Sequence, residues 1–403
     1  KYLEEAVPIL RELDDRQGLV NALLNLAIRA LTDTGILGDI NYLQLTNLSD
    51  EALQIAGEIH WYQGEALALL QGAICLKQAG EYMQAFERLA RAQPMMEENQ
   101  DRESLARLHL TLGQILVDLL ALTEARQHFE MGLALVQELG SGILTVAATA
   151  HLASAALLEN DFAHAQALLV ELLPGEYPQG QELSPQIACW SVRAELEVRQ
   201  GYPDHALEIV DRLLASTPNL AQYGPHAVPR LSRLRGQALA ALGRMEDAEA
   251  ELHGTLPVAR AHGRRSMLWR LHADLGKVYR AMGRREDAQR EFSAARTIIQ
   301  ELADRVPEGA LRDHFLKQAL ATIPAMPALT PRQLAKKEFG GLTGRERQVA
   351  ALITQGKSNR EVADELVISE KTAERHVANI LAKLGFNSRA QIAAWSVTKR
   401  LDQ

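Results

Sequence analysis

Side chains suited to hydrogen bonding with nucleic-acid bases and phosphates gather near the C-terminus of this 403-residue chain. Arg375 and Lys371 suit phosphates or guanine edges, and Asn379 suits an adenine edge. Free amides and the helix dipole favour a phosphate at the start of the preceding predicted helix. The residues at that start are Ser358, Asn359 and Arg360. Such residue types indicate reversible contact with a phosphodiester strand.

Two predicted helices joined by a short turn must position these side chains. A short helix from Ser358 to about Leu366 is followed by the turn 367–369 and a longer helix that stops at Gly385. Apolar residues on the longer helix recur at steps of four, three, one and three, and are Ala373, Val377, Ile380, Leu381 and Leu384. The residues that must therefore point away from the core are Lys371, Thr372, Glu374, Arg375 and Asn379. This layout predicts a helix-turn-helix whose second helix enters the major groove.

Caps mark the ends of four short helices in this segment. In a capping box, a Ser or Thr hydroxyl accepts from the amide of the third helical residue, and a Glu or Gln there reaches back. The three boxes pair Thr343 with Glu346, Ser358 with Glu361, and Ser388 with Gln391. Ser369 caps the remaining helix, and Gly356 and Gly385 stand where a left-handed residue is favoured. The segment therefore predicts a four-helix domain.

The segment carries an LTxRE opening, a GxSNxEVA second helix, an ISxxTxxxHVxNIxxKLG longer helix and an SR-led fourth helix. With these motifs it resembles the LuxR-type, or GerE-like, DNA-binding domain. The resemblance implies DNA contacts from the face between Lys371 and Asn379, where His376 is either a base reader or a packed residue. It also implies dimerisation through the fourth helix, Ser388–Thr398.

Three residues of this segment have two interpretations each. The family commonly has Val-Lys after the recognition-helix threonine, whereas this chain has Ala373-Glu374. Glu374 therefore either accepts from a cytosine amino group or is solvated. On the fourth helix, which begins at the predicted cap Ser388, Ile392 and Trp395 fit either a dimer contact or the core of a small domain.

Charge is unevenly distributed along the chain. The net charge is −8, yet residues 341–403 hold ten Lys or Arg against seven Asp or Glu, which is a net +3. Residues 1–340 hold 33 against 44, a net −11. Only the C-terminal segment is therefore expected to present a nucleic-acid surface.

A repeat precedes this segment. An alanine lies five residues beyond a turn residue in six places, and the pairs are Gly80 with Ala85, Leu120 with Ala125, Asn160 with Ala165, Gly201 with Ala206, Gly243 with Ala248, and Gly283 with Ala288. Successive alanines are 40, 40, 41, 42 and 40 residues apart. The last unit resembles the tetratricopeptide repeat, through Leu275, Gly276, Tyr279, Gly283, Ala288, Phe292 and Ala295. The pattern predicts a solenoid of helical hairpins with a period longer than the usual 34 residues.

The chain is thus expected to be all-α, with three parts. Residues 1–304 are predicted to form a tetratricopeptide-like solenoid of about seven hairpins, the first truncated. Residues 305–341 are predicted to hold a capping helix, roughly Glu308 to Thr322, and a proline-rich linker. Residues 342–403 form the LuxR-type domain.

The N-terminal part bears on the kind of regulator this is. YLEEAVPILREL, at the start, has the pattern of the second helix of a preceding repeat, so the chain is expected to be a fragment of a longer protein. Repeats followed by a LuxR-type domain resemble the large ATP-binding regulators of the LuxR family, which include the maltose-operon activator. Because no GxxxxGK[ST] loop is present, no cofactor is predicted within this chain, and an ATPase switch would lie upstream of Lys1.

A basic region is predicted on the concave side of the solenoid. The tetratricopeptide register places five cations of the last two repeats there, namely Arg230, Arg233, Arg270, Lys277 and Arg280. They would suit a carboxylate or phosphate on a peptide, protein or small-molecule effector. The alternative is that these side chains are solvated or neutralised by the acidic body.

Other function classes find little support in the sequence. Cys75 and Cys189 lie in unrelated apolar stretches, so no disulfide framework or thiolate metal site is predicted, and a reducing cytoplasm fits. The longest apolar run, Ile143 to Leu158, is too short to span a membrane and indicates a buried helix. Scattered histidines and the lack of a nucleophile motif leave catalysis and metal binding without candidates.

Two hypotheses follow. In the first, the chain is a signal-responsive transcriptional regulator, whose array senses an effector or partner and controls self-association on double-stranded DNA. In the second, it is a tetratricopeptide interaction scaffold whose helical tail docks on a protein. Docking would require an exposed apolar patch on the second helix of the helix-turn-helix, where the sequence instead has polar and charged residues.

Overall fold

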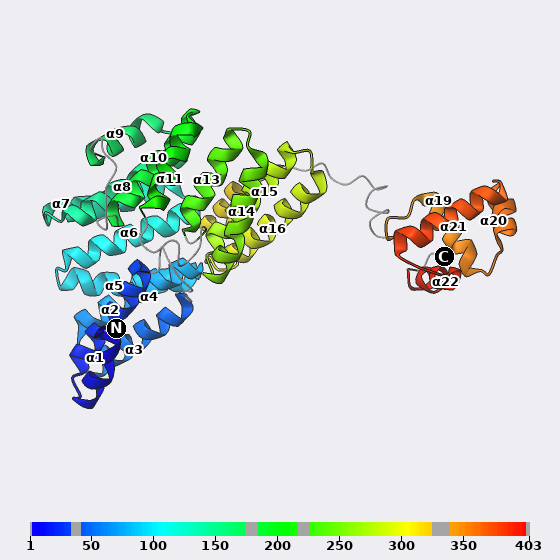
Figure 1. Cartoon of the computed structure of the whole chain (residues 1–403). Coiled ribbons are helices and arrows are strands. Elements are labelled where there is room, and N and C mark those ends of the chain that lie inside the picture. The colour runs from blue at the N-terminus through cyan, green and yellow to red at the C-terminus, as the bar shows by residue number, and fades with distance from the viewer. Residues whose placement is uncertain are drawn as a thin grey trace. The chain divides into compact units, whose positions relative to one another are not determined.

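The computed structural model describes residues 2–33, 42–173, 184–216, 226, 228–324 and 339–399. These residues form α-helices joined by turns, with no strand among them, which confirms the all-α prediction. Contacts divide the chain into two units, residues 1–324 and residues 325–403 (Figure 1). We call the first unit the array and the described part of the second, residues 339–399, the head.

The array consists of antiparallel helices that pack against their neighbours in chain order (Figure 1). Its helices are α1 (Tyr2–Glu12), α2 (Arg16–Asp33), α3 (Tyr42–Glu58), α4 (Tyr62–Ala79), α5 (Tyr82–Glu98), α6 (Arg102–Asp118), α7 (Leu122–Glu138), α8 (Gly142–Leu158), α9 (Phe162–Leu172), α10 (Ser184–Gln200), α11 (Pro203–Ala215), α13 (Pro229–Ala241), α14 (Met245–Ala261), α15 (Arg265–Ala281), α16 (Arg285–Ala303) and α17 (Ala310–Ala321).

Helix length explains the stretched repeat period. Helices α6, α7 and α8 each have 17 residues, and three residues separate each helix from the next. A hairpin and its connections therefore occupy 40 residues. The first helices α4, α6, α8, α10, α13 and α15 contact one another in succession, whereas α5, α7, α9, α11, α14 and α16 are the second helices of their hairpins.

The residues that defined the period have the roles that their types suggest. All six turn residues adopt a positive φ, between 59° at Leu120 and 88° at Gly201. All six alanines are fully buried at the start of a second helix, where a larger side chain would hold the two helices apart. The sequence period therefore reports a backbone turn and a close helix contact in each hairpin.

The last hairpin shows why its glycine is needed. Gly276 in α15 faces the ring of Phe292 in α16, so that a β-carbon at Gly276 would lie 2.4 Å from Phe292 Cε1. Phe292 has no exposed surface and cannot swing away. Gly113 faces Phe129 in the same manner in an earlier hairpin, also at 2.4 Å. An aromatic ring on one helix thus fills the space that glycine leaves on the other.

We expect Gly276→Ala to destabilise the array. Overpacking a core costs about 1–3 kcal/mol, whereas alanine gains at most about 1 kcal/mol over glycine within a helix. Gly57→Ala in α3 is the matched control, because the nearest atom to its β-carbon would be Glu65 Oε1 at 3.9 Å. Urea unfolding followed by far-ultraviolet circular dichroism should show a lower midpoint for Gly276→Ala and an unchanged or higher one for Gly57→Ala. A higher midpoint for both would contradict this packing role.

The array closes on itself. Glu81, between α4 and α5, accepts from Arg265 and Arg305, each at 3.1 Å, and the Met83 amide donates to the Arg305 carbonyl at 2.8 Å. Arg264, at the start of α15, donates to the Tyr42 hydroxyl of α3 at 2.8 Å. Helices far apart in the chain therefore meet along a seam between α3–α5 and α15–α16.

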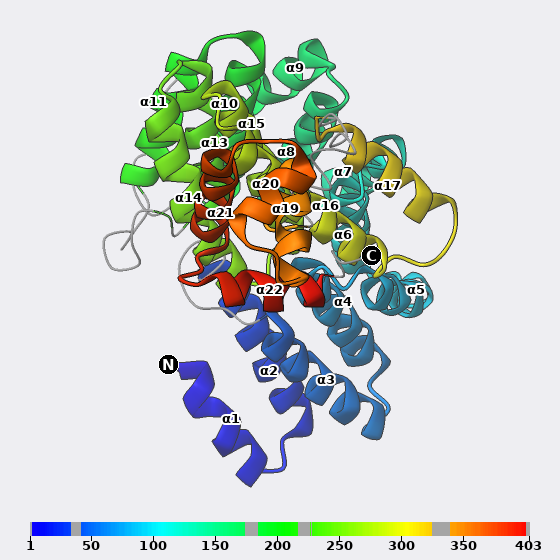
Figure 2. The ribbon, with the colours of Figure 1, turned by 90° about the vertical axis from the view of Figure 1, so that its right-hand side faces the viewer.

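Helix α17 lies after the last hairpin, close to the predicted span of roughly Glu308 to Thr322. Its Phe315 is fully buried, and Leu311 packs against the cluster formed by α6, α7 and α8. Figure 2 shows the ribbon of α17 near that of α7. His314 Nε2 lies 3.0 Å from the carbonyl oxygen of Leu120. The proline-rich linker falls mostly on residues 325–338, which lie outside the described residues.

The head contains four helices, α19 (Gly344–Thr354), α20 (Asn359–Leu366), α21 (Glu370–Leu384) and α22 (Arg389–Thr398). Its core gathers Leu342, Val349 and Ile353 around α19 with Val362 of α20, Ala373 and Ile380 of α21 and Ile392 of α22. Helix α19 contacts all three other helices. It therefore packs against both α20 and α21, the two helices of the helix-turn-helix.

Candidate nucleic-acid interface

The predicted caps of the head all form. The backbone amides of Thr343 and Ser358 each donate to a carboxylate three residues on, at 2.7 Å, and the Ser388 amide donates to Gln391 at 3.1 Å. The Ser369 hydroxyl accepts from the amide of Thr372 at 3.2 Å. These bonds satisfy amides that would otherwise lack partners and fix where each helix begins.

The turn between α20 and α21 is the predicted three-residue turn. Val367 closes α20 with φ 52° and ψ 53°, and the Ile368 amide donates to the Ala363 carbonyl at 2.9 Å. A β-branched residue with this left-handed backbone is strained. Its side chain is 90% exposed, so packing does not hold it in place. The strained turn sets the angle at which α21 leaves α20.

The apolar stripe of α21 points inward as expected. Ala373 and Ile380 are fully buried, and Val377, Leu381 and Leu384 pack against the same core. The exposed residues of the opposite face are Lys371, Glu374, Arg375, Ala378, Asn379 and Ala382. Charged groups therefore occupy the N-terminal half of this face and alanines its C-terminal half, which leaves space for a helix to approach a groove.

Most other described Lys and Arg side chains of the head are hydrogen-bonded within the head, whereas those on the exposed face of α21 are not. The described Lys and Arg side chains bonded within the head are Arg345 with Gln348, Lys357 with Glu365, Lys383 with Glu346, and Arg389 with Asn359. Arg360, Lys371 and Arg375 are exposed and form no hydrogen bond or ion pair with any described residue, and the same holds for Lys399. Three of these four uncommitted cations lie on α20 and α21.

The remaining predicted contact residues are partly occupied by the fold. The Ser358 hydroxyl is used by its capping box, and Asn359 Oδ1 accepts from Arg389 at 2.7 Å. Thr372 Oγ1 lies 2.8 Å from the Ser369 hydroxyl. These three side chains lie beside the exposed face of α21, and their hydrogen bonds also hold α20 and α21 in position.

Glu374 and His376 differ in exposure. Glu374 is exposed beside Arg375 and has no hydrogen-bond partner among the described residues. His376 is half-buried, and its Nδ1 is buried without a partner in the described part of the chain. Glu374 is therefore the more accessible of the two for contact with a ligand.

This geometry is that of a known DNA-binding family. Residues 341–396 match the family model of bacterial regulatory proteins of the luxR family. Spore germination protein GerE of Bacillus subtilis (strain 168) is 46% identical over 61 residues, which are 14% of this chain and 82% of that protein. This chain belongs to the luxR family of bacterial regulatory proteins.

Other similarities concern either the luxR-type head or the fold of the array. The uncharacterized transcriptional regulatory protein YhcZ of Bacillus subtilis (strain 168) is 46% identical over 67 residues, which are 17% of this chain and 31% of that protein. The chain thus spans less than a third of that relative. A crystal structure of a Rap protein complexed with Competence and Sporulation Factor has 13% identity and a TM-score of 0.50, covering 94% of this chain and 95% of that one. This last similarity shows the helical-repeat fold alone.

The dimerisation residues need one correction. Ile392 is fully buried in the head's own core, so its side chain has no surface to offer a second chain. Trp395 is partly buried and packs against the same core, whereas Ser388 is exposed at the start of α22. The apolar side chains that α22 exposes are Ala390, Ala394 and Val397. Their spacing of four and three residues places them on one stripe.

The five predicted groove cations do not lie together. Arg230, Arg233 and Arg270 line one cavity inside the array, whereas Lys277 lines a separate groove with Asp274. Arg280 is exposed and lines neither. The basic region predicted from the sequence is therefore divided among the cavity, the groove and the exposed surface.

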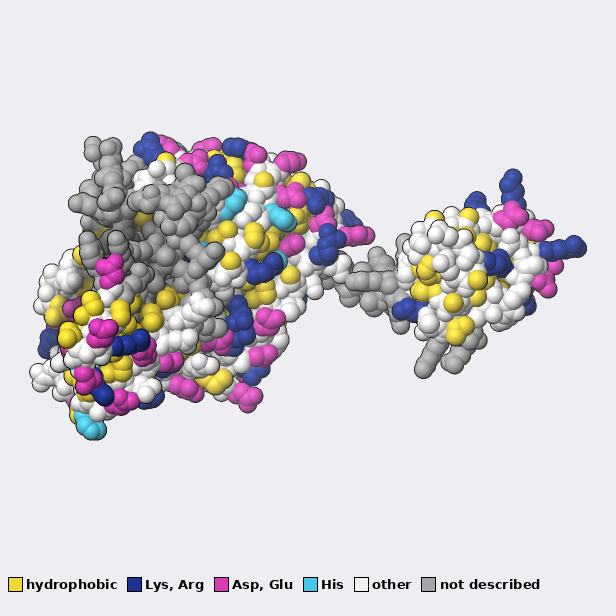
Figure 3. All heavy atoms as spheres, turned by 60° about the horizontal axis from the view of Figure 1, so that its bottom comes forward, with side chains coloured by type: hydrophobic (Ala, Val, Ile, Leu, Met, Phe, Trp, Pro, Cys, Tyr) yellow, Lys and Arg dark blue, Asp and Glu magenta, His cyan; other side chains and the backbone are white. Residues whose placement is uncertain are grey.

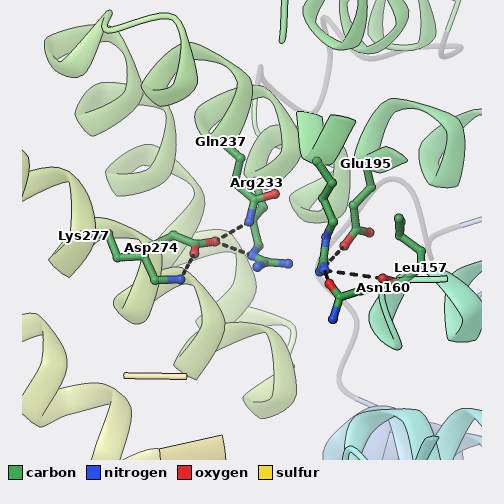
Figure 4. A network of polar contacts seen from close by, with 8 residues as sticks. Leu157, Asn160, Glu195, Arg233, Gln237, Asp274 and Lys277 are labelled. Carbon is green, nitrogen blue, oxygen red and sulfur yellow. Dashed lines mark hydrogen bonds and ion pairs between the residues drawn. The ribbon is translucent and has the colours of Figure 1, made fainter. Parts of the chain in front are cut away.

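Three of these cations form ion pairs: Arg233 and Lys277 share the single carboxylate of Asp274, and Arg270 lies 3.8 Å from Asp118. Arg233 Nε donates to Asp274 Oδ2 at 2.7 Å, and Lys277 Nζ donates to Asp274 Oδ1 at 3.3 Å (Figure 4). Burial opposes ionisation of Asp274, but Arg233 and Lys277 hold the pKa of that carboxyl below its ordinary value. On the face of the array drawn in Figure 3, Lys and Arg side chains are likewise interspersed with Asp and Glu side chains.

Sequence reasoning missed two cations that complete the internal cavity. Lys77 of α4 and Arg264 at the start of α15 line it together with Arg230. They lie far apart in the sequence, and only the closure of the array brings them together. The available signal for Lys77, which is 8% exposed, was a lysine directly after the apolar run from Gly72 to Leu76.

None of the described helices is long and apolar enough to cross a membrane. In the same residues, no three His, Cys, Asp or Glu side chains come together as a metal site would require. Cys75 and Cys189 are both buried as free thiols, and burial raises their pKa values to about 12 and about 11. Thiolate chemistry therefore has no accessible group at either position.

Proposed function

We propose that this chain is a signal-responsive, DNA-binding transcriptional regulator whose head reads double-stranded DNA as a self-associated pair. The carrying observation is the set of uncommitted, exposed cations on α20 and α21, Arg360, Lys371 and Arg375. A fold that needed these charges for its own stability would have bonded them, as it has bonded Lys383 and Arg389. Their freedom favours a partner that supplies negative charge.

In this proposal each exposed residue of α21 has a distinct part. Lys371 contacts a phosphate, Arg375 contacts a guanine or a phosphate, and Asn379 contacts an adenine. Arg360 and the backbone amides at the start of α20 bind the sugar-phosphate backbone of the DNA. Glu374 accepts from a cytosine amino group or faces solvent. One head neutralises few phosphates, so a second head supplies the remaining affinity.

Pairing is proposed to use the exposed stripe of α22. Ala390, Ala394 and Val397 present a small apolar surface that two heads bury against each other, in addition to the exposed cap Ser388. Two recognition helices would then contact half-sites about one DNA turn apart. The array would control this pairing, with an effector or partner as the signal. The Rap protein of similar fold is complexed with Competence and Sporulation Factor, which supports a sensing role for the array.

The scaffold alternative is less well supported. A docking helix needs an exposed apolar patch, and the exposed face of α21 has only the two alanines among its apolar residues. The large exposed apolar side chains of the head, Val367 and Val397, lie on the turn before α21 and on α22.

Selection from a random duplex library at several salt concentrations tests the regulator proposal. The full chain is expected to enrich a two-fold related motif with an affinity that falls steeply with salt. Arg375→Ala should cost about 1–3 kcal/mol and relax the preference at one position, and Lys371→Ala should reduce the salt slope by about one. Lys399→Ala, which removes an equally exposed and uncommitted cation away from α21, is the matched control. Equal losses in all three variants, or no enrichment at all, would favour the scaffold.

A further inference from the structure

The first helices of the array enclose a cavity of about 270 Å³. Its wall carries five cations, Lys77, Arg230, Arg233, Arg264 and Arg270, and two acids, Asp118 and Glu195. These residues come from α4, α6, α10 and α13 and from the beginning of α15, so that the cavity lies along the inner side of the closed array. Positive charge exceeds negative charge on a wall that is partly removed from water.

The nearby carboxylates are already engaged by other groups. Asp274 pairs with Arg233 at 2.7 Å, outside the cavity wall. Glu195 pairs with Arg199 at 3.4 Å (Figure 4). Asp118 accepts from the Tyr82 hydroxyl at 3.2 Å and lies 3.8 Å from Arg270. Among the described residues, neither of the two wall carboxylates forms an ion pair with Lys77 or Arg230.

Two cations of the wall, Lys77 and Arg230, form no ion pair with a described residue, although Asp118 and Glu195 attract them from a longer distance. Lys77 donates to Gln114 Oε1, and Gln114 Nε2 lies 2.7 Å from His151 Nε2. Because the same amide group donates to that ring nitrogen, His151 accepts at Nε2 and stays neutral. Arg230 is half-buried and forms no hydrogen bond or ion pair with any described residue. A guanidinium with five donors and no acceptor is costly in such a place.

The electrostatics agree with this geometry. Burial lowers the pKa of Lys77 to about 8, against the attraction of Asp118 and with the repulsion of Arg264. Burial also lowers the pKa of Arg230 against the attraction of Glu195, and Arg233 and Arg264 lower it further. Burial, with Lys77 and Arg230 nearby, lowers the pKa of His151 to about 3. Each of these shifts would be relieved by a negative charge placed between the cations.

We propose that this cavity binds a small dianion, a molecule carrying a phosphate, a sulfate or two carboxylate groups, which Arg230 and Lys77 hold with Arg264 beside them. The volume suits a ligand at the small end of the range for protein pockets rather than a long peptide. Arginine forks and a lysine ammonium are the groups that hold phosphate and carboxylate in other proteins.

The site also spans the seam. Lys77 belongs to α4 and Arg264 to the beginning of α15, and these two segments meet where the array closes. A dianion held by both would favour the closed array over an open one, because its contacts exist only when the seam is formed. The idea that the anion regulates pairing of the heads rests on the proposed function. Binding of the anion to the cavity does not.

Calorimetric titration of the full chain with sulfate, inorganic phosphate and succinate tests the proposal, in chloride of matched ionic strength. At least one anion should bind saturably, and the preference between them identifies the oxyanion or the dicarboxylate. Arg230→Met should weaken binding about 10- to 100-fold, as expected for loss of a hydrogen-bonded charge. Arg280→Met, on the same part of the array but outside the cavity, should not change the affinity. Lys77→Met serves as the second variant where Arg230→Met fails to fold.

Hydrogen exchange provides the second measurement. The Met83 amide, bonded across the seam to Arg305, should exchange more slowly in the presence of the anion. Absence of saturable binding by all three anions, or an unchanged affinity in both cavity variants, overturns the site. Unchanged exchange at Met83 with intact binding overturns the seam role. Loss of anion binding with operator selection intact overturns the anion site and leaves the proposed function in place. Anion binding without operator selection keeps the site and overturns the proposed function.

Discussion

A chain carrying Ala394→Glu is expected to bind a two-half-site operator at least about 100-fold more weakly than the wild type, because linkage of two sites commonly contributes about 10²–10⁴ in affinity. Ala394 is exposed in the middle of the α22 stripe, between Ala390 and Val397. A carboxylate there would be desolvated against a second carboxylate in a symmetric pair. The reading face of α21 is left untouched.

The comparison that isolates pairing uses three duplexes and one control. Fluorescence anisotropy is measured with the selected operator, with a single half-site and with an unrelated duplex. Ala394→Glu should lower the affinity for the operator to that for the half-site and leave the other two nearly unchanged. Ala394→Ser keeps the size of the side chain and should behave as the wild type. An equal loss on all three duplexes would indicate that the added charge acts on DNA directly and that α22 does not pair the heads.

Local sequence signals were sufficient where the structure is determined by neighbouring residues. The caps at Thr343, Ser358 and Ser388 need only a hydroxyl and a Glu or Gln three residues later, and all three form. The inward direction of Ala373 and Ile380 follows from helix periodicity alone. The positions of Ala85 and Ala288 in the array follow from the same kind of short-range pattern. The two helices of the DNA-reading motif were therefore predictable to the residue.

Signals failed where the outcome depends on distant parts of the chain. Ile392 lies on α22, whose two faces both carry apolar residues, and only the packing of α22 against α19 decides which face is buried. The seam joins Glu81 to Arg265 and Arg305 across 184 and 224 residues. The curvature that closes the array is the sum of small rotations between hairpins, which no single repeat encodes. For the same reason Lys77 and Arg264 could not be assigned to one cavity with Arg230.

Lys383→Met is expected to destabilise the head by about 1.5–3 kcal/mol, the range for a hydrogen bond to a charged group. Lys383 Nζ donates to both carboxylate oxygens of Glu346, each at 2.6 Å, and joins the end of α21 to the start of α19. The Glu346 side chain is only 4% exposed. Without Lys383 the carboxylate keeps its bond from the Thr343 amide but loses the cation that offsets its burial.

The pH dependence has a defined sign. Burial alone would raise the pKa of Glu346, but bonds from Lys383 and Thr343 hold that pKa below the ordinary value of 4.5. The stabilisation is therefore fully present above about pH 4.5 and is lost as pH falls through the lowered folded value. The difference in stability between the wild type and Lys383→Met should be full near neutral pH and shrink towards zero in acid. A difference that is constant down to strongly acidic pH would show that Lys383 contributes packing rather than charge.

Two further variants separate charge from capping. Gln391 makes the same reach-back bond in the Ser388 box, so Glu346→Gln should keep the cap and remove only the charge. In the Glu346→Gln background, Lys383→Met should cost clearly less than in the wild type, which is the coupling expected of a direct pair. Lys371→Met, on the same helix without a described partner, should change stability by less than about 0.5 kcal/mol. Hydrogen exchange of the α19 and α21 amides in the full chain, corrected for intrinsic rates at each pH, measures the wild type and the four variants by the same local unfolding free energy. A cost of Lys383→Met that is the same in both backgrounds would mean that α19 and α21 are joined by the apolar core alone.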